Sequence, residues 1–404
     1  MPDALLDFLS SGLFSPSLLL LGLWLLLSIE LTILTVTLYL HRSQAHRAVD
    51  FHPALAHVFR FWNWLSTGMV VREWVAVHRK HHARCETEED PHSPAIHGMP
   101  RVLWHGVSLY QRAKREPGLL SKYGRGAPED RLERWLYGRR SSIGPALYLL
   151  IEFLAFGVPG IAIWALQMLA IPVLAAGVVN GLGHGVGYRN FETEDRSTNL
   201  LPLGLFLGGE ELHNNHHAFP TSARFALRRG EIDLGYLILR GLQRLGLANI
   251  LREAPQVGER AGITSPDQET LRALLIDRFG VMSRYFREVT LPTLRQELAS
   301  RGGRLRALPR RMRRALASGP HWLDAANRER FRLWLSECPL TARCVEYRQR
   351  LRLLIARGSA DAEALRLALR DWMREAEASG IEALARFASR LAALSPVPLR
   401  ASGG

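Results

Sequence analysis

Residues 18–46 read LLLLGLWLLLSIELTILTVTLYLHRSQAH, an apolar run that leads directly into two histidines, His41 and His46. The part before His41 is 23 residues long and contains one charged residue, Glu30. About 20 apolar residues are enough for a helix to cross the hydrocarbon core of a bilayer. The sequence therefore predicts a membrane-spanning helix with histidines at one of its ends.

The charges on either side of this run predict its orientation. Asp3 and Asp7 precede it, and Arg42 and Arg47 follow it. Because basic residues are enriched on the cytoplasmic side of membrane helices, we expect the N-terminus outside and His41 at the cytoplasmic face.

Two more apolar runs, 143–158 and 161–180, flank Pro159-Gly160. Two apolar runs joined by a Pro-Gly turn predict a tight helical hairpin through the bilayer. The hairpin returns the chain to the cytoplasmic side, so all the histidine clusters are expected on one face of the membrane.

Two intervening segments do not have the pattern of a span. Residues 54–76 are apolar but are interrupted by charged side chains such as Arg60 and Glu73, which favours an amphipathic or re-entrant helix at the inner face. Residues 98–142 are polar and basic, with several Gly and Pro, and indicate a cytoplasmic connection.

The composition changes after about residue 250, where the chain becomes charged and rich in Arg, Ala and Leu. We predict two domains, a membrane domain over 1–250 and a helical, soluble extension over 251–404. Together these expectations describe an all-α integral membrane protein. It has three to four transmembrane helices, interfacial helices, a cytoplasmic cap that holds the histidines, and a helical C-terminal tail.

Two stretches of the tail have a pattern of their own. The basic run RGGRLRALPRRMRRAL (301–316) fits either an anionic lipid or phosphate ligand or a solvated helix face. The stretch WMREAEASGIEALARFASRL (372–391) faintly resembles a helical segment of bacterial transposases. No catalytic carboxylate triad accompanies it, so transposition is not inferred.

The charge and the cysteines narrow the class of protein. A net charge of +14 suits an anionic membrane face, phosphates or nucleic acid. Without zinc-finger spacing or an RNA-binding signature, nucleic acid is not expected as a partner. The three cysteines form no CxxC pair and no iron–sulfur pattern, which favours ordinary reduced thiols and an electron carrier on a separate protein.

Eight of the fifteen histidines fall in three short clusters, HRSQAH, HRKHH and HNNHH, and a ninth follows the last apolar run. The nine residues are His41, His46, His78, His81, His82, His184, His213, His216 and His217. Positions i, i+3 and i+4 share one face of a helix, so the imidazoles of one HxxHH turn can converge. Imidazole suits Fe, Zn and Cu, whereas a structural zinc typically includes cysteine. The pattern therefore predicts a reactive site with two metal ions.

Carboxylates adjoin two of these clusters. Glu86 and Glu88 follow HRKHH together with Asp90, and Glu211 precedes HNNHH. Ligating histidines usually donate their second N–H to a carboxylate or a carbonyl. We predict this supporting position for Asp90 and Glu211, and a solvated loop for Glu86 and Glu88.

These residues match a known family. The order HRxxxH, HRxHH, HNxHH resembles that of the membrane fatty-acid desaturases, most closely the acyl-CoA Δ9 branch. The resemblance covers roughly residues 15–250. Beyond the three boxes it is carried by REWVAVHRKHH (72–82), EEDPHSP (88–94), NGLGHGVGYRNFE (180–192), NLLPLGLFLGGEELHNNHH (199–217) and AFPTSARFALRRGEID (218–233).

The resemblance implies a centre of two Fe ions held by the nine histidines, with Asn180 directly or through water at one iron. It implies O2-dependent removal of two hydrogens from a saturated acyl chain, carried by CoA or by a lipid. Trp74 is expected in the lining of the acyl tunnel and Arg189 near its cytoplasmic mouth. NAD(P)H would supply electrons through a reductase and a ferredoxin or cytochrome b5-like carrier. The Arg-rich, Lys-poor composition favours a bacterial inner membrane, with the metals facing the cytoplasm.

Two other functions stay open. Related boxes occur in di-iron hydroxylases of alkanes, sterols and carotenoids, although NGxxHxxGYR combined with GExxHNNHH favours a desaturase. A non-catalytic membrane metal-binding or transport protein would carry ionisable groups at mid-membrane and internal repeats. Here the histidines gather at the ends of the spans instead.

Overall fold

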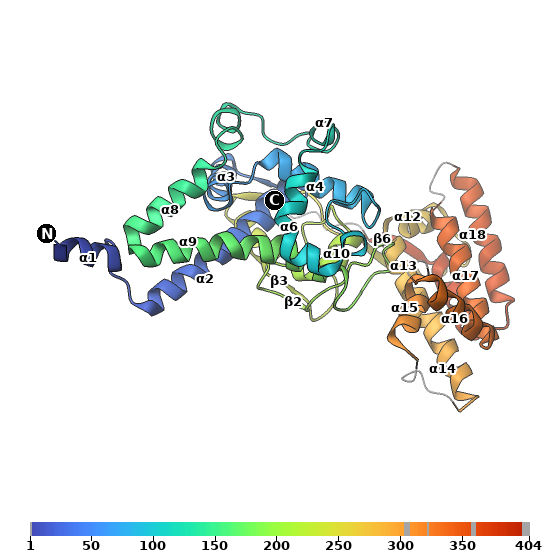
Figure 1. Cartoon of the computed structure of the whole chain (residues 1–404). Helices are drawn as coiled ribbons and strands as arrows, with labels where there is room; N and C mark the ends of the chain where they lie inside the picture. Colours follow the sequence, from blue (N-terminus) through green and yellow to red (C-terminus); the bar gives the residue numbers. More distant parts are fainter. Residues whose placement is uncertain (1, 303–307, 321–322, 357–360, 398–404) are drawn as a thin grey trace. The chain divides into compact units, whose positions relative to one another are not determined.

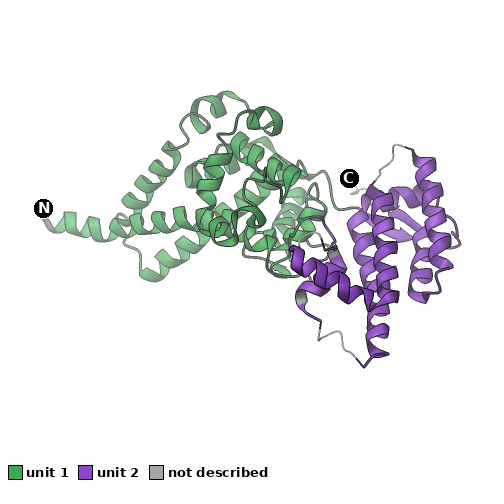
Figure 2. Ribbon diagram, turned by 45° about the vertical axis from the view of Figure 1, so that its right-hand side comes forward, with its two compact units in different colours: residues 1–189, 195–254 green, residues 190–194, 255–404 purple. Residues whose placement is uncertain are grey.

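The computed structural model describes residues 2–302, 308–320, 323–356 and 361–397. The chain divides into two compact units (Figure 2). The first unit contains residues 1–189 and 195–254, and the second contains 190–194 and 255–404. The division after residue 254 lies close to the predicted domain boundary. The assignment of 190–194 to the second unit has no counterpart in the sequence pattern.

The first unit is mainly helical. Its helices are α1 (Pro2–Ser11), α2 (Leu18–Thr35), η1 (Val36–Ala45), α3 (Pro53–Thr67), α4 (Val71–Arg84), α5 (Pro94–His97), α6 (Met99–Ala113), α7 (Leu119–Tyr123), η2 (Glu133–Tyr137), α8 (Ile143–Phe156), α9 (Val158–Ile171), η3 (Pro172–Val179), η4 (Leu182–His184), η5 (Glu210–Leu212), α10 (His213–Ala218) and α11 (Leu234–Arg244). Its strands are β1 (Val49–Phe51), β2 (Leu203–Gly204), β3 (Ile232–Asp233) and β4 (Ala248–Ile250).

Within the part of the chain that the structure describes, two continuous helices are long and apolar enough to cross a membrane (Figure 1). One runs from Leu18 to Ala45 (α2 and η1) and the other from Val158 to His184 (α9, η3 and η4). The predicted third span is shorter, because α8 has only 14 residues. Helix α2 exposes large apolar side chains, among them Leu18 at 88% and Leu26 at 67%, which is typical of a surface that faces lipid.

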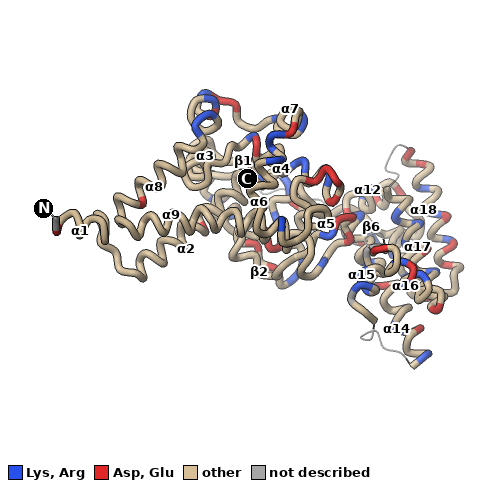
Figure 3. The backbone as a smooth tube through the Cα atoms, viewed as in Figure 1, with Lys and Arg blue, Asp and Glu red and all other residues tan. Residues whose placement is uncertain are grey.

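Polar contacts join the apolar helices to one another. Trp24 of α2 donates its indole N–H to Glu152 of α8 at 2.8 Å, and Gln167 of α9 bonds to Ser28 of α2. Such side-chain hydrogen bonds are a common means of association between helices in an apolar environment. Outside these contacts, α2, α8 and α9 are almost free of charged residues (Figure 3).

The segments that connect these helices are more ordered than expected. The predicted inner-face helix 54–76 is in fact two helices, α3 and α4, because the chain turns at Gly68 with a left-handed φ of 63°. The predicted cytoplasmic connection 98–142 begins with helix α6, which packs against η3. A Cβ at Gly177 would lie 2.6 Å from the carbonyl oxygen of Leu103, so a glycine is needed where these helices approach.

Buried polar contacts connect the first histidine box to segments that lie much later in the chain of this unit. Strand β1 pairs antiparallel with β4, and β2 pairs parallel with β3. Arg42 is fully buried and donates to Asp233 at 2.9 and 3.2 Å, and to the carbonyls of Gly208 and Ala223. Because Arg42 follows His41 directly, this ion pair fixes the backbone that carries the first histidine of the box.

The second unit has its own apolar core. It contains strands β5 (Gln256–Glu259) and β6 (Leu394–Val397), and helices α12 (Gln268–Ile276), α13 (Arg278–Tyr285), η6 (Phe286–Thr290), α14 (Leu291–Ala299), α15 (Arg310–Ser318), α16 (Ala325–Ser336), α17 (Pro339–Ala356), α18 (Ala362–Glu377) and α19 (Glu382–Ala392). Tyr285, Leu351 and Trp372 lie at its centre. The antiparallel pair of β5 and β6, like the short pairs of the first unit, departs from the predicted all-α fold.

The structure describes only part of the basic run 301–316, because residues 303–307 lie outside the described residues. Its last part forms α15, which buries Ala315 and Leu316 in a small core with Leu294 and Phe331. One face of this basic helix therefore packs against protein.

Candidate metal centre

The nine predicted histidines converge in two adjacent groups. In the first, one ring nitrogen from each of five residues lies within 4.8 Å of the others; these residues are His41, His46, His78, His82 and His216. In the second, the same limit joins His81, His184 and His217 to the thiol of Cys85. His213 completes the second group, with its Nε2 3.1 Å from Nε2 of His184.

Each HxxHH turn serves both groups, which differs from the predicted convergence of three imidazoles from one turn. In α4, His78 and His82 belong to the first group and His81 to the second. In α10 the assignment is reversed, since His213 and His217 join the second group and His216 the first. Residues four apart share a helix face, so each helix offers a pair to one group and a single residue to the other.

The first box uses a different helical geometry. His41 lies in the π-helical segment η1, and the backbone N–H of His46 donates to the carbonyl of His41, five residues earlier, at 3.0 Å. An α-helix would direct residues five apart to different sides, whereas the wider π-helical turn brings them together. The two rings lie 4.8 Å apart between centroids.

Carboxylates hold the outer nitrogens of four ligands. Nδ1 of His41 lies 2.6 Å from Glu210, Nδ1 of His81 lies 3.0 Å from Asp90, and Nδ1 of His217 lies 2.8 Å from Asp195. Nδ1 of His184 is 3.4 Å from Glu86. The four pairs fix the orientation of these imidazoles and favour the tautomer with a proton on Nδ1.

This arrangement corrects two of the predicted roles. Glu211 contacts no histidine among the described contacts, because its carboxylate accepts the backbone N–H groups of Phe206, Leu207 and Gly209. Its neighbour Glu210 takes the predicted place. Glu86 is half-buried beside His184 and accepts from the backbone of Arg196, so it does not belong to a solvated loop.

Asp90 and Asp195 are two further carboxylates beside the histidines, of which the sequence predicted only Asp90. Asp90 accepts from His81 and from the backbone of His92, as its position after the second box suggested. Asp195 was missed, because it lies between boxes in EDRSTN with no spacing that ties it to a ligand. An acidic residue between NGxxHxxGYR and HNNHH was the only available signal.

The free nitrogens fit metal ions. In the first group, Nε2 atoms face one another at 2.8 Å for His46 and His78, 2.9 Å for His82 and His216, and 3.0 Å for His41 and His216. In the second group, Nε2 of His81 and of His217 is buried without a hydrogen-bond partner. Facing lone pairs repel unless a cation lies between them, and the carboxylates have already engaged several of the Nδ1 atoms.

The electrostatics favour the metal-binding form of these side chains. Burial, reinforced by neighbouring imidazoles, holds the pKa of five ligands well below the usual range; they are His46, His78, His82, His213 and His216. Burial also lowers the pKa of His217 to about 4, against the opposing charge of Asp195. Most of the ligands are therefore neutral at physiological pH, as coordination requires.

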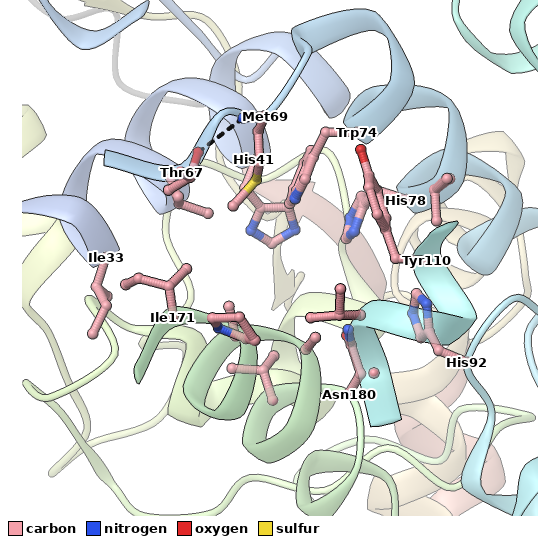
Figure 4. Close-up of a pocket in the computed structure, with 18 of the residues that line it drawn as sticks. Ile33, His41, Thr67, Met69, Trp74, His78, His92, Tyr110, Ile171 and Asn180 are labelled. Atoms are coloured by element: carbon pink, nitrogen blue, oxygen red, sulfur yellow. Dashed lines mark hydrogen bonds between the residues drawn. The ribbon is translucent and has the colours of Figure 1, made fainter. Parts of the chain in front are cut away.

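A largely apolar cavity of about 260 Å³ reaches both groups. Trp74, His41 and His78 project into it from one wall, and Ile171 and Asn180 from the wall opposite (Figure 4). The indole of Trp74 stacks on the ring of His78, with 4.9 Å between centroids and an interplanar angle of 8°. The cavity thus lies against the metal-binding groups, and Trp74 and Asn180 lie in its wall.

Arg189 lies outside the lining of this cavity. Its guanidinium donates to the backbone carbonyls of Asp195 and Ser197, at 2.9 and 2.8 Å. The structure therefore gives Arg189 a different position from the mouth of the tunnel that the resemblance implied. It supports the loop that carries Asp195.

Much of the first unit is similar to known proteins. The family model for fatty acid desaturases matches residues 16–231, more than half of the chain. The chain belongs to the fatty acid desaturase family. Its desaturase relatives identify it as an oxidoreductase of fatty-acid biosynthesis, and the family together with the two apolar helices indicates a membrane-associated protein.

Among the relatives of this desaturase are two proteins of Arabidopsis thaliana. Delta-9 acyl-lipid desaturase 2 is 32% identical over 232 residues, which cover 56% of this chain and 73% of that protein. Delta-9 acyl-lipid desaturase 1 is 32% identical over 235 residues, with coverage of 56% and 74%. The hex-5-enoyl-[acyl-carrier protein] acetylenase of Moorena producens (strain JHB) is 29% identical over 247 residues, which cover 57% of this chain and 74% of that protein.

A second family model, described as Transposase, matches residues 272–395 of the desaturase. This match includes the stretch 372–391, whose resemblance to a transposase segment was visible in the sequence. The match covers less than half of the chain and lies within the second unit.

Proposed function

We propose that this desaturase uses O2 at a di-iron centre to convert a saturated acyl chain, carried as acyl-CoA, to its cis-Δ9 monounsaturated form. The observation that carries the proposal is the position of the apolar cavity against both histidine groups. His41 and His78 of the first group and His213 of the second line it. The Δ9 position rests on the names of the Arabidopsis relatives.

The nine histidines would hold the two irons, and Asn180, which lines the cavity together with His213, would lie at one of them. Iron and oxygen together supply an oxidant strong enough for an unactivated methylene group, which no side chain supplies alone. The protein's own contribution is placement and the exclusion of water. Burial stabilises each CH2 by about 0.8 kcal/mol, and small errors in placement near the reacting atoms cost large factors in rate.

The cavity lining also contains a polar part that fits the carrier end of the substrate. Lys114 donates to Glu73 at 2.9 Å, and Gln111 lies near them in the lining. A polar group can be accommodated there while the acyl chain occupies the apolar remainder. Acyl-CoA, the proposed carrier, presents such a polar group. An acyl lipid and an acyl-carrier protein present one too, and the assay with purified protein distinguishes the three.

The electrons would come from NAD(P)H through a reductase and a separate ferredoxin or cytochrome b5-like carrier, since the chain has no iron–sulfur spacing of its own. The two apolar helices would span a bacterial inner membrane. The histidines would then face the cytoplasm.

The fatty-acid profile of a bacterial host that expresses the chain tests the proposal. A new monounsaturated acid should appear with the unmodified chain and with His105→Ala, whose side chain is exposed and outside both groups, but not with His217→Ala. A hydroxylated product would replace the proposal by the hydroxylase alternative. Purified protein, supplied in turn with acyl-CoA, acyl-carrier protein and phospholipid, then identifies the carrier.

A further inference from the structure

The second histidine group contains a side chain that the boxes do not predict. Cys85 is the C-cap residue of helix α4 and follows His81 by four residues. The Cys85 thiol and one ring nitrogen each of His81, His184 and His217 lie within 4.8 Å of one another. Ligand atoms about 2.0–2.3 Å from one ion lie at most about 4.5 Å apart, so only small shifts separate this group from coordination.

The neighbouring nitrogens point independently to a cation at this place. Nε2 of His81 and Nε2 of His217 are buried and have no hydrogen-bond partner. Asp90 and Asp195 engage the Nδ1 atoms of the same rings. The unpartnered nitrogens therefore belong to the side of each ring that is available to the ion.

The backbone turns sharply directly after Cys85. Glu86 has a left-handed φ of 59°, which is uncommon for a residue other than glycine. Its carboxylate accepts from the backbone of Arg196 at 2.7 Å and lies 3.4 Å from Nδ1 of His184. These contacts compensate for the strained turn and hold the end of α4 against the second group.

We infer that Cys85 is a thiolate ligand of the second metal ion. This inference rests on the proposed function for the identity of the site, but not on the reaction. On coordination the S–H bond is broken, a metal–sulfur bond forms, and the proton passes to solvent. Cys85 does not line the acyl cavity, so its bond to the ion leaves the substrate side of the site open. A soft sulfur donor beside imidazoles also strengthens binding of thiophilic ions such as Zn²⁺ and Co²⁺.

Co²⁺ is a suitable probe, because a cobalt–thiolate bond gives a charge-transfer band in the near ultraviolet that imidazole ligands do not give. The full-length protein in detergent is stripped of metal and loaded with Co²⁺. Two ions per chain and the charge-transfer band are expected for the unmodified protein and for Cys344→Ser, whose thiol is buried in the second unit. Cys85→Ser is expected to lose the band.

Alkylation supplies a second readout that needs no variant. Iodoacetamide should modify Cys85 at least tenfold more slowly in the Co²⁺-loaded protein than after chelation, as followed by peptide mass mapping. Two bound ions without a band, a band that persists in Cys85→Ser, or equal alkylation rates would overturn the inference and leave the proposed desaturation intact. Failure to bind cobalt at all would overturn both.

Discussion

At the scale of single residues, the site depends on which nitrogen of each imidazole is left free. Carboxylates at Nδ1 of His41, His81 and His217 direct Nε2 toward the metal positions. In Asp195, burial raises the pKa, but the charge and the hydrogen bond of His217 hold it well below its usual range. The carboxylate therefore stays ionised and accepts from the imidazole throughout the physiological pH range.

Asp195→Asn tests this support without changing a ligand. The amide keeps the shape but loses the charge, and loss of such outer partners typically costs about 10- to 100-fold in metal affinity. We expect one of the two ions to be released that much more readily to a chelator, measured as metal content over time. The exposed Glu88→Gln in the nearby acidic loop is the matched control, and equal release from both variants would contradict the role.

The convergence of the nine histidines could be expected from the sequence, because eight of them lie in three short boxes, and Asp90 closely follows the second box. Their role as ligands stays a prediction. The positions of Asp195 and Glu210 could not be expected, since their partners His217 and His41 lie 22 and 169 residues away. The choice of Glu210 over Glu211 depends on a 3-10 turn that directs neighbouring side chains to different sides. No pattern in the sequence shows which side faces the ligands.

A second titrating group lies away from the metals. Burial raises the pKa of Glu133 to about 7, opposed by Arg60 and reinforced by Asp130. The native state therefore holds a proton that the unfolded chain loses above about pH 4.5. The stability that this proton contributes is full below about pH 4.5 and is lost as the pH rises through about 7.

Glu133→Gln should remove this pH dependence, because the amide is neutral throughout. We expect the thermal midpoint of the unmodified protein in detergent to fall between pH 5 and 8 relative to that of the variant, by a few degrees (on the order of 1 kcal/mol). Glu129→Gln, an exposed neighbour that pairs with Arg72, should keep the slope of the unmodified protein. Parallel midpoints for the unmodified protein and Glu133→Gln would refute the assignment.

At the scale of elements, the centre is built from helices α4 and α10 and from the π-helical segment η1. Helix α4 gives two histidines to the first group and one to the second, whereas α10 gives one to the first and two to the second. Periodicity predicted that the HxxHH stretches are helical, and α4 and α10 confirm it. It could not predict the π-helical winding of η1, because Val36–Ala45 contains no proline or glycine that would mark a change of helix type. Nor did the polar sequence of 98–142 show that α6 would pack on η3 beside the cavity.

The contact of α6 with η3 can be tested at one position. Gly177→Ala places a methyl group 2.6 Å from the carbonyl oxygen of Leu103, which forces the two backbones apart. We expect a loss of about 1–3 kcal/mol in stability, measured by thermal unfolding in detergent. Gly22→Ala in α2 meets no atom within 4 Å and should be neutral or slightly stabilising. A similar effect of both variants would mean that the close approach is not needed.

At the scale of the whole molecule, the desaturase part and the second unit each have a core of their own. The change in composition near residue 250 was readable from the sequence, because the chain becomes charged and rich in Arg, Ala and Leu there. The assignment of residues 190–194 to the second unit was not readable from the sequence, because a five-residue segment is too short to show a periodicity. Phe191 is buried, and Ser283 of the same unit donates to the carbonyl of Asn190 at 2.7 Å.

Residues 190–194 of the second unit are joined along the chain to the histidine site, because Asp195 follows them directly. Truncation after Ala254 removes Ser283, which donates to the carbonyl of Asn190, and Arg348, whose guanidinium lies 4.0 Å from the carboxylate of Glu192. We therefore expect the truncated chain to keep the first metal ion and to lose the second at least tenfold faster to a chelator, since His217 depends on Asp195. Full-length Ser283→Ala, which removes only the hydrogen bond, should show a smaller effect in the same direction. If the truncated chain retains both ions as firmly as the full-length protein, the loop around Asp195 is held by the desaturase unit alone.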